Sequence, residues 1–295
     1  MHDRRDIDLA GTTFLIGIML VLAVNQVVIK LTNEGLQPVF ASGLRSLGAA
    51  LVIWAVIRAR GLRLDFAAGT LGAGVLAGLI FTVEFLALFI ALDLTTVARV
   101  SVIFYSMPVW MALAAHLLLP GERLTPLRLV GLALAFAGVA WAIVDRSGLG
   151  GEASLWGDIA ALVGALGWVG VSLMPRVSAL GRLRFEMQMF WQVAVSAPVM
   201  LAAALVYGGP LVRDFTGATA WMMLFQIVVV ASGVFLAWFW LLGRYKASQV
   251  AAFAFLSPVF GVAMGWLWLG ETVTAALLAQ LALVVAGIVL INRRG

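Results

Sequence analysis

The stretch SMPVWMALAAHLLLPGERLT, residues 106–125, is written a second time as LSPVFGVAMGWLWLGETVT, residues 256–274. In both copies a proline interrupts an apolar run, a Gly-Glu pair follows, and a threonine stands three residues beyond the glutamate. Pro108 and Pro258 lie 150 positions apart, which is about half of the 295-residue chain. The doubling predicts a chain made of two similar halves.

The repeat extends beyond this motif. FLALF at 85–89 recurs as FLAWF at 235–239, again 150 positions later. Gly138 in AFAGVA matches Gly287 in VVAGIV at a spacing of 149. The first two apolar runs of each half match only weakly, so the repeat is best defined in the later part of each half.

The composition indicates a membrane protein. Hydrophobic residues make up 63% of the chain and charged residues 11%, with a mean hydropathy of +1.08, far from the averages of soluble domains. A helix of about 20 apolar residues crosses a hydrocarbon core about 30 Å thick. The sequence therefore predicts an all-α integral membrane protein with ten transmembrane helices. We expect them at 11–33, 38–59, 68–91, 96–118, 126–144, 154–179, 185–207, 216–243, 247–268 and 274–291.

Five spans in each half decide how the halves insert. After an odd number of crossings the chain is on the other side of the membrane, so two similar halves enter from opposite sides and form an inverted repeat. We expect a cytoplasmic tail at 1–10, a first five-helix repeat at 11–145 and a second, inverted repeat at 154–292. Inverted repeats that meet around a midplane site are a recurrent plan of secondary transporters. A duplication kept only for packing is the alternative.

Basic residues predict the orientation. Fourteen of the nineteen Lys and Arg residues fall on the face that holds the amino terminus and four on the other, while Arg45 lies within a span. By the positive-inside rule both termini are cytoplasmic, as expected for a multi-pass protein of the cell inner membrane. The basic residues are scattered over short segments, so the expected partner is the lipid bilayer and not nucleic acid. The fourteen are Arg4, Arg5, Arg58, Arg60, Arg63, Arg123, Arg128, Arg176, Arg182, Arg184, Arg244, Lys246, Arg293 and Arg294.

The residue inventory argues against an enzyme. Two histidines, no cysteine and scattered carboxylates form no cluster of nucleophiles, acid–base pairs or metal ligands. A Gly-rich phosphate loop with a lysine is absent from the sequence, which argues against ATP-driven pumping by this chain alone. We expect no catalytic residue, no cofactor and no metal. An integral-membrane enzyme is the alternative from another class.

Both copies of the repeated motif resemble the EamA-type drug/metabolite transporter family. The runs that carry the resemblance are ALDLTTVARVSVIFYSMPVWMALAAHLLLPGERLTPLRLVGLALAFAGV and KASQVAAFAFLSPVFGVAMGWLWLGETVTAALLAQLALVVAGIVL. Each contains a span with a central proline, a Gly-Glu turn followed by Thr, and a span with Ala-Gly near its end. Within the family the chain looks most like the YddG-type exporters of aromatic and other amino acids.

The resemblance implies a ten-helix inner-membrane carrier that exports amino acids or related metabolites. Its cavity would be lined chiefly by spans 1, 3, 4, 6, 8 and 9, with spans 5 and 10 peripheral. The tyrosine before the central proline of such exporters matches Tyr105, and the next-but-one position matches Met107. Met107 and Glu84 stand where the resemblance leads us to expect aromatic residues, which favours a broad pocket that tolerates methionine.

Polar side chains within spans are candidate site residues. An ionised group near the bilayer centre costs about 2.5–3.5 kcal/mol on insertion scales. A carboxylate at Glu84 therefore implies a functional or a structural role. It either faces the cavity, where it contacts a substrate ammonium or binds a transported proton, or it pairs internally with Arg45 or Arg99. We expect a structural role for Arg45 and an interfacial position for Arg99. Asn25 is expected to offer a neutral hydrogen bond in the cavity, with helix packing as the alternative.

Prolines and aromatic residues complete the predicted site. Pro108 and Pro258 lack an N–H, so each frees a carbonyl four residues earlier, which in lipid needs a partner unless it lines a wet cavity. We expect both prolines to kink helices beside the site and to help them bend, with a harmless bend as the alternative. Aromatic residues in the middle of spans are candidates for an apolar wall, with plain packing as the alternative. They are Phe104, Tyr105, Trp168 and Trp238.

Together these features predict a secondary transporter, expected to be a monomer, that exports amino acids by alternating access. Aromatic and other neutral amino acids are the expected substrates. A carrier of other small amphiphilic metabolites or drugs is the alternative within transport. Proton coupling and facilitated diffusion are both compatible with one deep carboxylate.

Overall fold

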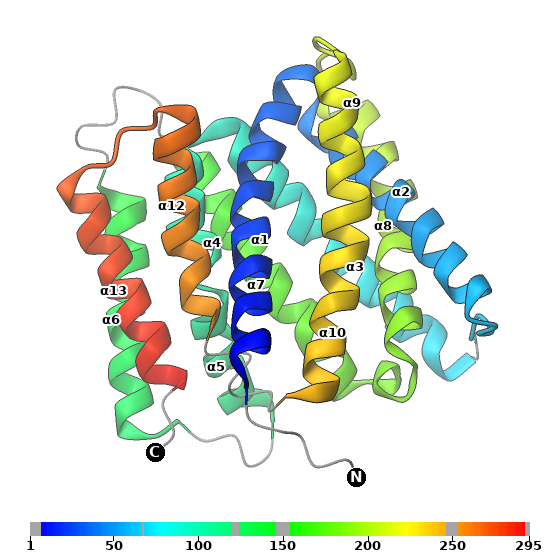
Figure 1. Cartoon of the computed structure of the whole chain (residues 1–295), viewed down its shortest axis with the longest axis horizontal. Coiled ribbons are helices and arrows are strands. Elements are labelled where there is room, and N and C mark those ends of the chain that lie inside the picture. The colour runs from blue at the N-terminus through cyan, green and yellow to red at the C-terminus, as the bar shows by residue number, and fades with distance from the viewer. Residues whose placement is uncertain (1–6, 67, 120–123, 146–153, 246–252, 293–295) are drawn as a thin grey trace.

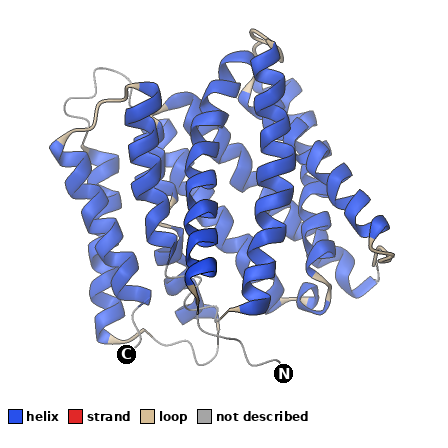
Figure 2. Cartoon of the chain, in the orientation of Figure 1, coloured by secondary structure: helices blue, strands red, loops and turns tan. Residues whose placement is uncertain are grey.

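The computed structural model describes residues 7–66, 68–119, 124–145, 154–245 and 253–292. Over these ranges the chain is helical between short turns, as Figure 2 shows. The short 3₁₀ turns are η1 and η3, and η2 is a π-helix. The elements are α1 (Leu9–Gly35), α2 (Pro38–Ala59), α3 (Ala68–Leu94), α4 (Val97–Phe104), α5 (Met107–Leu118), α6 (Pro126–Val144), α7 (Leu155–Val177), η1 (Ala179–Arg182), α8 (Phe185–Tyr207), α9 (Gly217–Leu224), η2 (Phe225–Val234), α10 (Phe235–Arg244), η3 (Phe253–Phe255), α12 (Leu256–Leu269) and α13 (Ala275–Asn292).

The predicted all-α membrane fold is confirmed. Within the described residues nine helical stretches are long and apolar enough to cross a membrane, with α4 and α5 counted as one stretch. A further apolar helix, Phe253–Leu269, is shorter. It corresponds to the predicted span 247–268, whose first part lies outside the described residues.

The crossings alternate, so the bundle has two distinct ends (Figure 1). We call them the Leu9 end, where α1 begins, and the Glu271 end, where α12 passes into α13. α1 runs from the Leu9 end to the Glu271 end, whereas α7, the first helix of the second half, runs the opposite way. The chain is therefore built as two inverted five-helix repeats. The start of α1 and the end of α13 lie at the same end.

The fourth span is broken where its proline predicts a break. α4 ends at Phe104, and α5 begins at Met107 with Pro108 in its first turn. Since Pro108 cannot donate to the carbonyl four residues earlier, the chain makes a turn instead: the Ser106 Oγ donates to the carbonyl of Ile103 at 2.5 Å. In the second half Pro258 likewise stands in the first turn of α12, directly after the 3₁₀ turn η3.

The eighth span contains the π-helix η2 between α9 and α10. Within it the hydroxyl of Ser232 donates to the carbonyl of Ile227, five residues earlier, at 2.9 Å. Helical segments of this kind are rare and are frequent at functional sites. The π-helix was not predictable from the sequence, because the residues from Phe225 to Val234 form an ordinary apolar run.

Helices α6 and α13, the fifth of each repeat, pack together at one edge of the bundle (Figure 1). A Cβ on Gly131 would lie 2.8 Å from the carbonyl oxygen of Gly287, and one on Gly138 would lie 2.9 Å from that of Gln280. The two backbones touch because these positions lack side chains. Both helices lie at the edge of the bundle in Figure 1, as the family resemblance implied.

Candidate functional site

Five buried polar side chains gather in one layer of the bundle, which we call the polar layer. They are Asn25 and Gln26 of α1, Arg45 of α2, Glu84 of α3 and Gln226 of η2, all at most 5% exposed. Each stands seven to ten residues from the Glu271 end of its span. At 1.5 Å per residue this is a depth of about 10–15 Å. The predicted site residues Asn25, Arg45 and Glu84 therefore lie at a common depth.

The polar layer is not fully hydrogen-bonded within the described part of the chain. One buried atom of each member has no partner there: Asn25 Oδ1, Gln26 Nε2, Arg45 Nε, Glu84 Oε2 and Gln226 Oε1. A buried polar group without a partner costs about 1–3 kcal/mol, and such groups in native proteins call for an explanation such as a bound water or ligand. Five in one layer make it the candidate site for a polar solute.

Two hydrogen bonds hold the layer to neighbouring helices. Ser101 of α4 donates to Gln26 Oε1 at 2.6 Å, and Gln226 donates to the hydroxyl of Thr32 at 2.9 Å. Gln26 thus joins α1 to α4, and Gln226 joins α1 to η2. These two amides connect helices, which is the structural role that polar residues within spans can have. Each amide still has one atom without a hydrogen-bond partner.

Glu84 lies at a close crossing between the two repeats. A Cβ on Gly167 of α7 would lie 2.9 Å from Cα and Cβ of Glu84, so the backbone of α3 is pressed against α7 here. The sequence offered Arg45 or Arg99 as internal partners of Glu84. The structure brings Arg45 close to it, since the guanidinium of Arg45 lies over the ring of Phe85, the residue after Glu84, whereas Arg99 pairs with Asp158.

The aromatic candidates divide into different settings. Phe104 and Tyr105 are buried and meet edge to face, with ring centroids 5.6 Å apart. Phe104 also contacts α7, since a Cβ on Gly164 would lie 3.2 Å from its ring. Met107 is half-buried and packs against the main core. Trp168 is half-buried in α7.

The side chain of Trp238 lies outside the described residues, although its backbone belongs to α10. The described neighbours of Trp238 still locate this part of the span. Ala237 lines a groove between α1 and α10, and Trp240 meets Phe14 edge to face with ring centroids 5.8 Å apart. The structure gives the location of three of the four predicted aromatic side chains, and their role as a wall for a substrate stays a prediction.

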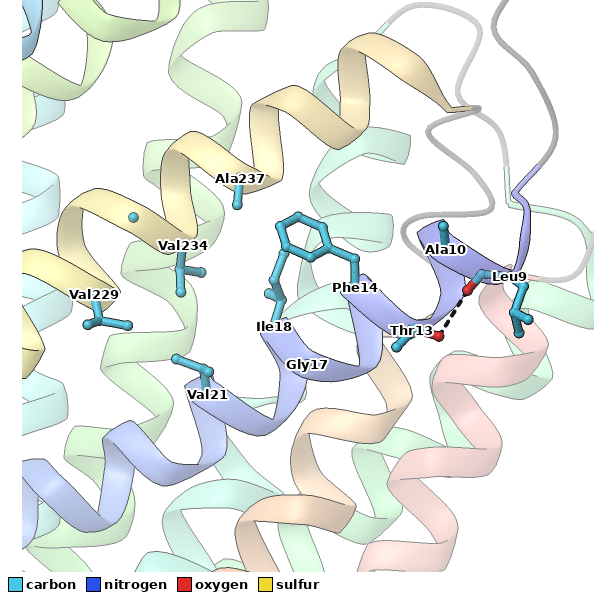
Figure 3. A pocket seen from close by; sticks show the side chains of 11 residues that line it. Leu9, Ala10, Thr13, Phe14, Gly17, Ile18, Val21, Val229, Val234 and Ala237 are labelled. Carbon is cyan, nitrogen blue, oxygen red and sulfur yellow. Dashed lines mark hydrogen bonds between the residues drawn. The ribbon is translucent and has the colours of Figure 1, made fainter.

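A groove of about 960 Å³ opens between α1 and the η2–α10 segment, in the half of the bundle toward the Leu9 end. Figure 3 shows apolar side chains of the two segments pointing toward one another across it. The hydroxyl of Thr13 donates to the carbonyl of Leu9 at 3.0 Å, so this lining residue turns its polar group to its own helix. The groove is lined by Leu9, Ala10, Thr13, Phe14, Gly17, Ile18, Val21, Val229, Gly233, Val234 and Ala237.

The groove ends one helical turn from the polar layer. Val21 is the lining residue of α1 nearest the Glu271 end, and Asn25 follows it four residues later on the same face. On the opposite wall Val229 follows Gln226 by three residues. An apolar passage and a set of unpartnered polar atoms are therefore adjacent, which suits a ligand with one apolar and one polar part.

At the Glu271 end the bundle is closed by the repeated Gly-Glu motif. The carboxylate of Glu271 accepts hydrogen bonds from the backbone N–H of Val97 at 2.7 Å and of Ala98 at 2.8 Å. These are the first two residues of α4, whose N–H groups have no partner within the helix. The negative charge also suits the positive end of the helix dipole. Glu271 therefore fastens the α12–α13 turn of the second repeat to the start of α4 in the first.

Buried charges strengthen the closure. Arg99 is 1% exposed, and its Nη2 lies 2.6 Å from Oδ2 of Asp158 on α7. It also donates to the carbonyls of Ala142 and Asp145 at the end of α6. Arg99 stands in the first turn of α4, near the end of its span as expected. Its side chain is buried because α6 and α7 supply acceptors on both sides of it.

Two further contacts join helices at this end. Arg213 pairs with Asp93 at 2.8 Å, which raises the pKa of the Arg213 guanidinium. Lys30 donates to the carbonyl of Thr95 at 2.7 Å. The sequence marked Glu271 as part of a motif but could not reveal its target, because the target is backbone 173 and 174 residues away. Asp158 carried no signal of its own.

Among the described residues there is no group of three or more His, Cys, Asp or Glu side chains that could hold a metal ion. The polar layer offers amide, guanidinium and single carboxylate groups, which recognise a ligand by hydrogen bonds and charge.

Ten apolar spans in two inverted repeats, with a groove that leads to a buried polar layer, define a polytopic membrane protein built to bind a small solute. The EamA-like transporter family model matches residues 9–144 and again residues 155–293. The chain belongs to the EamA-like transporter family. The resemblance seen in the sequence is thereby confirmed.

Relatives and one solved structure agree with this assignment. The "Uncharacterized transporter YvbV" of Bacillus subtilis is 30% identical over 87% of this chain and 83% of its own length. A protein of Salmonella typhimurium named "Probable amino-acid metabolite efflux pump" is 27% identical over 92% of this chain and 91% of its own. A solved crystal structure with a TM-score of 0.63 and 21% identity covers 95% of this chain and 97% of that chain, which is a likeness of fold.

Proposed function

We propose that the protein is a secondary transporter that exports amino acids by alternating access. The observation that carries the proposal is a difference between two equivalent helix crossings. In an inverted repeat, the crossing of α3 with α7 is equivalent to the crossing of α9–α10 with α1. The first is packed along its length, and the second contains the groove.

The packed crossing is made by glycines of α7. Gly157 meets Thr95, Gly167 meets Glu84, and a Cβ on Gly170 would lie 2.8 Å from Ile80. Together these contacts hold α3 against α7 from the Glu271 end to beyond the polar layer.

The equivalent crossing is joined at its two ends and holds the groove between them. At the Leu9 end a Cβ on Gly11 would lie 2.8 Å from the ring of Tyr245, whose hydroxyl donates to Asp8 at 2.7 Å. α1 meets α9 near the Glu271 end, where a Cβ on Gly35 would lie 2.6 Å from the hydroxyl of Thr219. At the spacing of 150 that relates the two halves, Glu84 corresponds to Val234 and Gly167 to Gly17. Gly17 and Val234 both line the groove, and a Cβ on Gly17 would meet nothing within 4 Å. Exchange of the two arrangements would close the groove and open the other side.

Three observations support amino acids as the substrates. The polar layer carries both charges and amides, and the groove accepts apolar side chains. Relatives are named as amino-acid metabolite efflux pumps, and a protein of Streptantibioticus cattleyicolor that is 30% identical over 63% of this chain is named "Probable terminal-alkyne amino-acid exporter". The wholly apolar groove favours other small amphiphilic metabolites as the second candidate.

The charge distribution supports the orientation. Basic side chains gather at the Leu9 end, whereas Lys30, Arg99 and Arg213 at the Glu271 end are engaged in hydrogen bonds or ion pairs. We therefore place the Leu9 end and both termini in the cytoplasm and the protein in the cell inner membrane. The groove then faces the cytoplasmic half of the bilayer, as an exporter needs for loading. We propose a monomer as the working unit.

The test uses disulfides in a chain that has no cysteine of its own. The pair Ile80→Cys and Gly170→Cys joins the packed crossing, and the pair Gly17→Cys and Val234→Cys spans the groove. A disulfide needs Cβ atoms about 3.5–4.5 Å apart, so the second pair joins only if the groove closes.

In liposomes loaded with a panel of amino acids, either disulfide should stop flux and reduction should restore it. Each single-cysteine variant serves as the control for its pair. Flux at the full rate with either bridge closed would contradict alternating access. A panel in which no amino acid moves would contradict the substrate class.

A further inference from the structure

Arg45 and Glu84 are a basic and an acidic side chain in the same buried layer, but they stay apart. Neither makes a hydrogen bond or an ion pair within 4 Å to the part of the chain that the structure describes. The guanidinium of Arg45 nevertheless lies against the ring of Phe85, the residue after Glu84, so the two residues are near neighbours. A pair whose only purpose is structural should close to contact, and Arg99 with Asp158 does so at 2.6 Å in the same molecule.

Both charged groups are held in place from outside the pair. The guanidinium of Arg45 lies over the ring of Phe85, with its central carbon 4.1 Å from the ring centroid, which is a cation–π contact. The backbone of Glu84 is fixed against Gly167. A Cβ on Gly48, one turn from Arg45, would lie 2.5 Å from Ile227, so α2 is fixed against η2 as well. The separation is therefore a property of the packed helices.

The unpartnered atoms indicate what fits between the two charges. A guanidinium presents a planar fork of donors that matches a carboxylate, and a carboxylate accepts from an ammonium. The unpartnered Oδ1 of Asn25 and Oε1 of Gln226 are further acceptors in the layer, placed at the side where the groove ends. A ligand with one carboxylate and one ammonium would satisfy both charges. A ligand with only one of them would leave the opposite buried charge without a partner.

We propose that the polar layer binds the zwitterionic head of an amino acid. Arg45 holds the carboxylate, Glu84 holds the ammonium with help from Asn25 and Gln226, and the side chain extends into the groove between α1 and η2–α10. This proposal rests on the proposed function and adds a role for Arg45 beyond the structural one that its sequence position favoured.

The test compares three probes with the same apolar part: phenylalanine, 2-phenylethylamine, which lacks the carboxylate, and 3-phenylpropanoate, which lacks the ammonium. Wild-type protein in detergent should show a rise in melting temperature with phenylalanine and little with the other two, because only a ligand of the folded state stabilises it. In liposomes phenylalanine should be transported at least about tenfold faster than either analogue, since sites built to bind a polar group reject ligands that lack it. This comparison requires no variant.

Variants then assign the two ends of the zwitterion. Glu84→Gln should lower the preference for phenylalanine over 3-phenylpropanoate by about tenfold. Arg45→Gln should lower the preference for phenylalanine over 2-phenylethylamine by a similar factor. Glu186→Gln is the matched control, because Glu186 pairs with Arg60 at 2.9 Å at the Leu9 end, and both preferences should stay as in the wild type. If the two buried residues are only structural, each substitution lowers all three rates alike.

The outcomes separate this proposal from the proposed function. Equal transport of phenylalanine and both analogues by the wild type overturns the zwitterion site and leaves a carrier of amphiphiles. Transport of phenylalanine with unchanged preferences in Glu84→Gln and Arg45→Gln also overturns it, while the proposed function stands. If neither phenylalanine nor any other amino acid of the liposome panel is bound or moved, both proposals fail.

Discussion

Removing the carboxylate of Glu271 should open the bundle at the end that it closes. Glu271→Gln keeps the size of the side chain but removes its charge and turns an amide NH₂ toward one of the two backbone donors, Val97 or Ala98. The carboxylate now accepts from both, at 2.7 and 2.8 Å, in a site where Glu271 is 5% exposed.

The size of the effect follows from these two contacts. A hydrogen bond to a charged group contributes about 1.5–3 kcal/mol, and a charge at a helix end contributes about 0.3–1 kcal/mol more. Loss of one bond and of the charge should therefore cost about 3 kcal/mol of closing free energy. At 1.4 kcal/mol per factor of ten this is about a hundredfold increase in the open population.

Alkylation of a buried thiol measures that population. Ser101 of α4 is fully buried and faces α12, where a Cβ on Gly261 would touch its hydroxyl group. Ser101→Cys is a nearly isosteric reporter, and it introduces the only thiol in the chain. Its reaction with a water-soluble maleimide should be about a hundredfold faster with Glu271→Gln than without it. Glu186→Gln should leave the rate within about threefold. Equal rates with and without Glu271→Gln would refute the reasoning.

Three further predictions concern the helices around the site. Pro108→Ala should allow α4 and α5 to join into one helix and should lower flux while the yield of folded protein stays largely intact; wild-type flux in well-folded protein would count against a bending role. Gly287→Leu should lower the melting temperature in detergent strongly, because its Cβ alone would lie 2.5 Å from the carbonyl oxygen of Gly131; an unchanged melting temperature would contradict the close packing. Asp158→Asn should destabilise the protein by about 3–5 kcal/mol, because it leaves a buried arginine without its charge partner. Asp93→Asn, whose arginine partner is 35% exposed, is the matched control and should cost about 1 kcal/mol or less in the same chemical-unfolding assay.

The fold could be predicted from local patterns because membrane insertion depends on them. Apolar runs of sufficient length, short turns and an odd number of spans per half are enough to give an inverted repeat. The break before Pro108 was also predictable, since a missing N–H acts within one helical turn. These features need no knowledge of distant contacts.

The site could be predicted only in part. Glu84 and Asn25 stood out because polar residues are costly inside an apolar run. The partners of Glu271 did not stand out, because they are backbone N–H groups, which every residue type except proline carries. Burial of Arg99 depends on acceptors brought by α6 and α7, and the π-helix of η2 depends on packing against α1 and α2. The sequence also does not predict which of the two equivalent crossings is open, because that is a property of the conformation.

The close glycine contacts between α6 and α13 reflect the relation between the two halves of the chain. At the spacing of 149 between the halves, Gly131 corresponds to Gln280 and Gly138 to Gly287. Gly131 touches Gly287, and Gly138 touches Gln280. The correspondence between the halves converts each contact into the other, as the twofold axis of a homodimer does. Two separate antiparallel copies of one five-helix unit would therefore meet at this edge through the same pair of contacts.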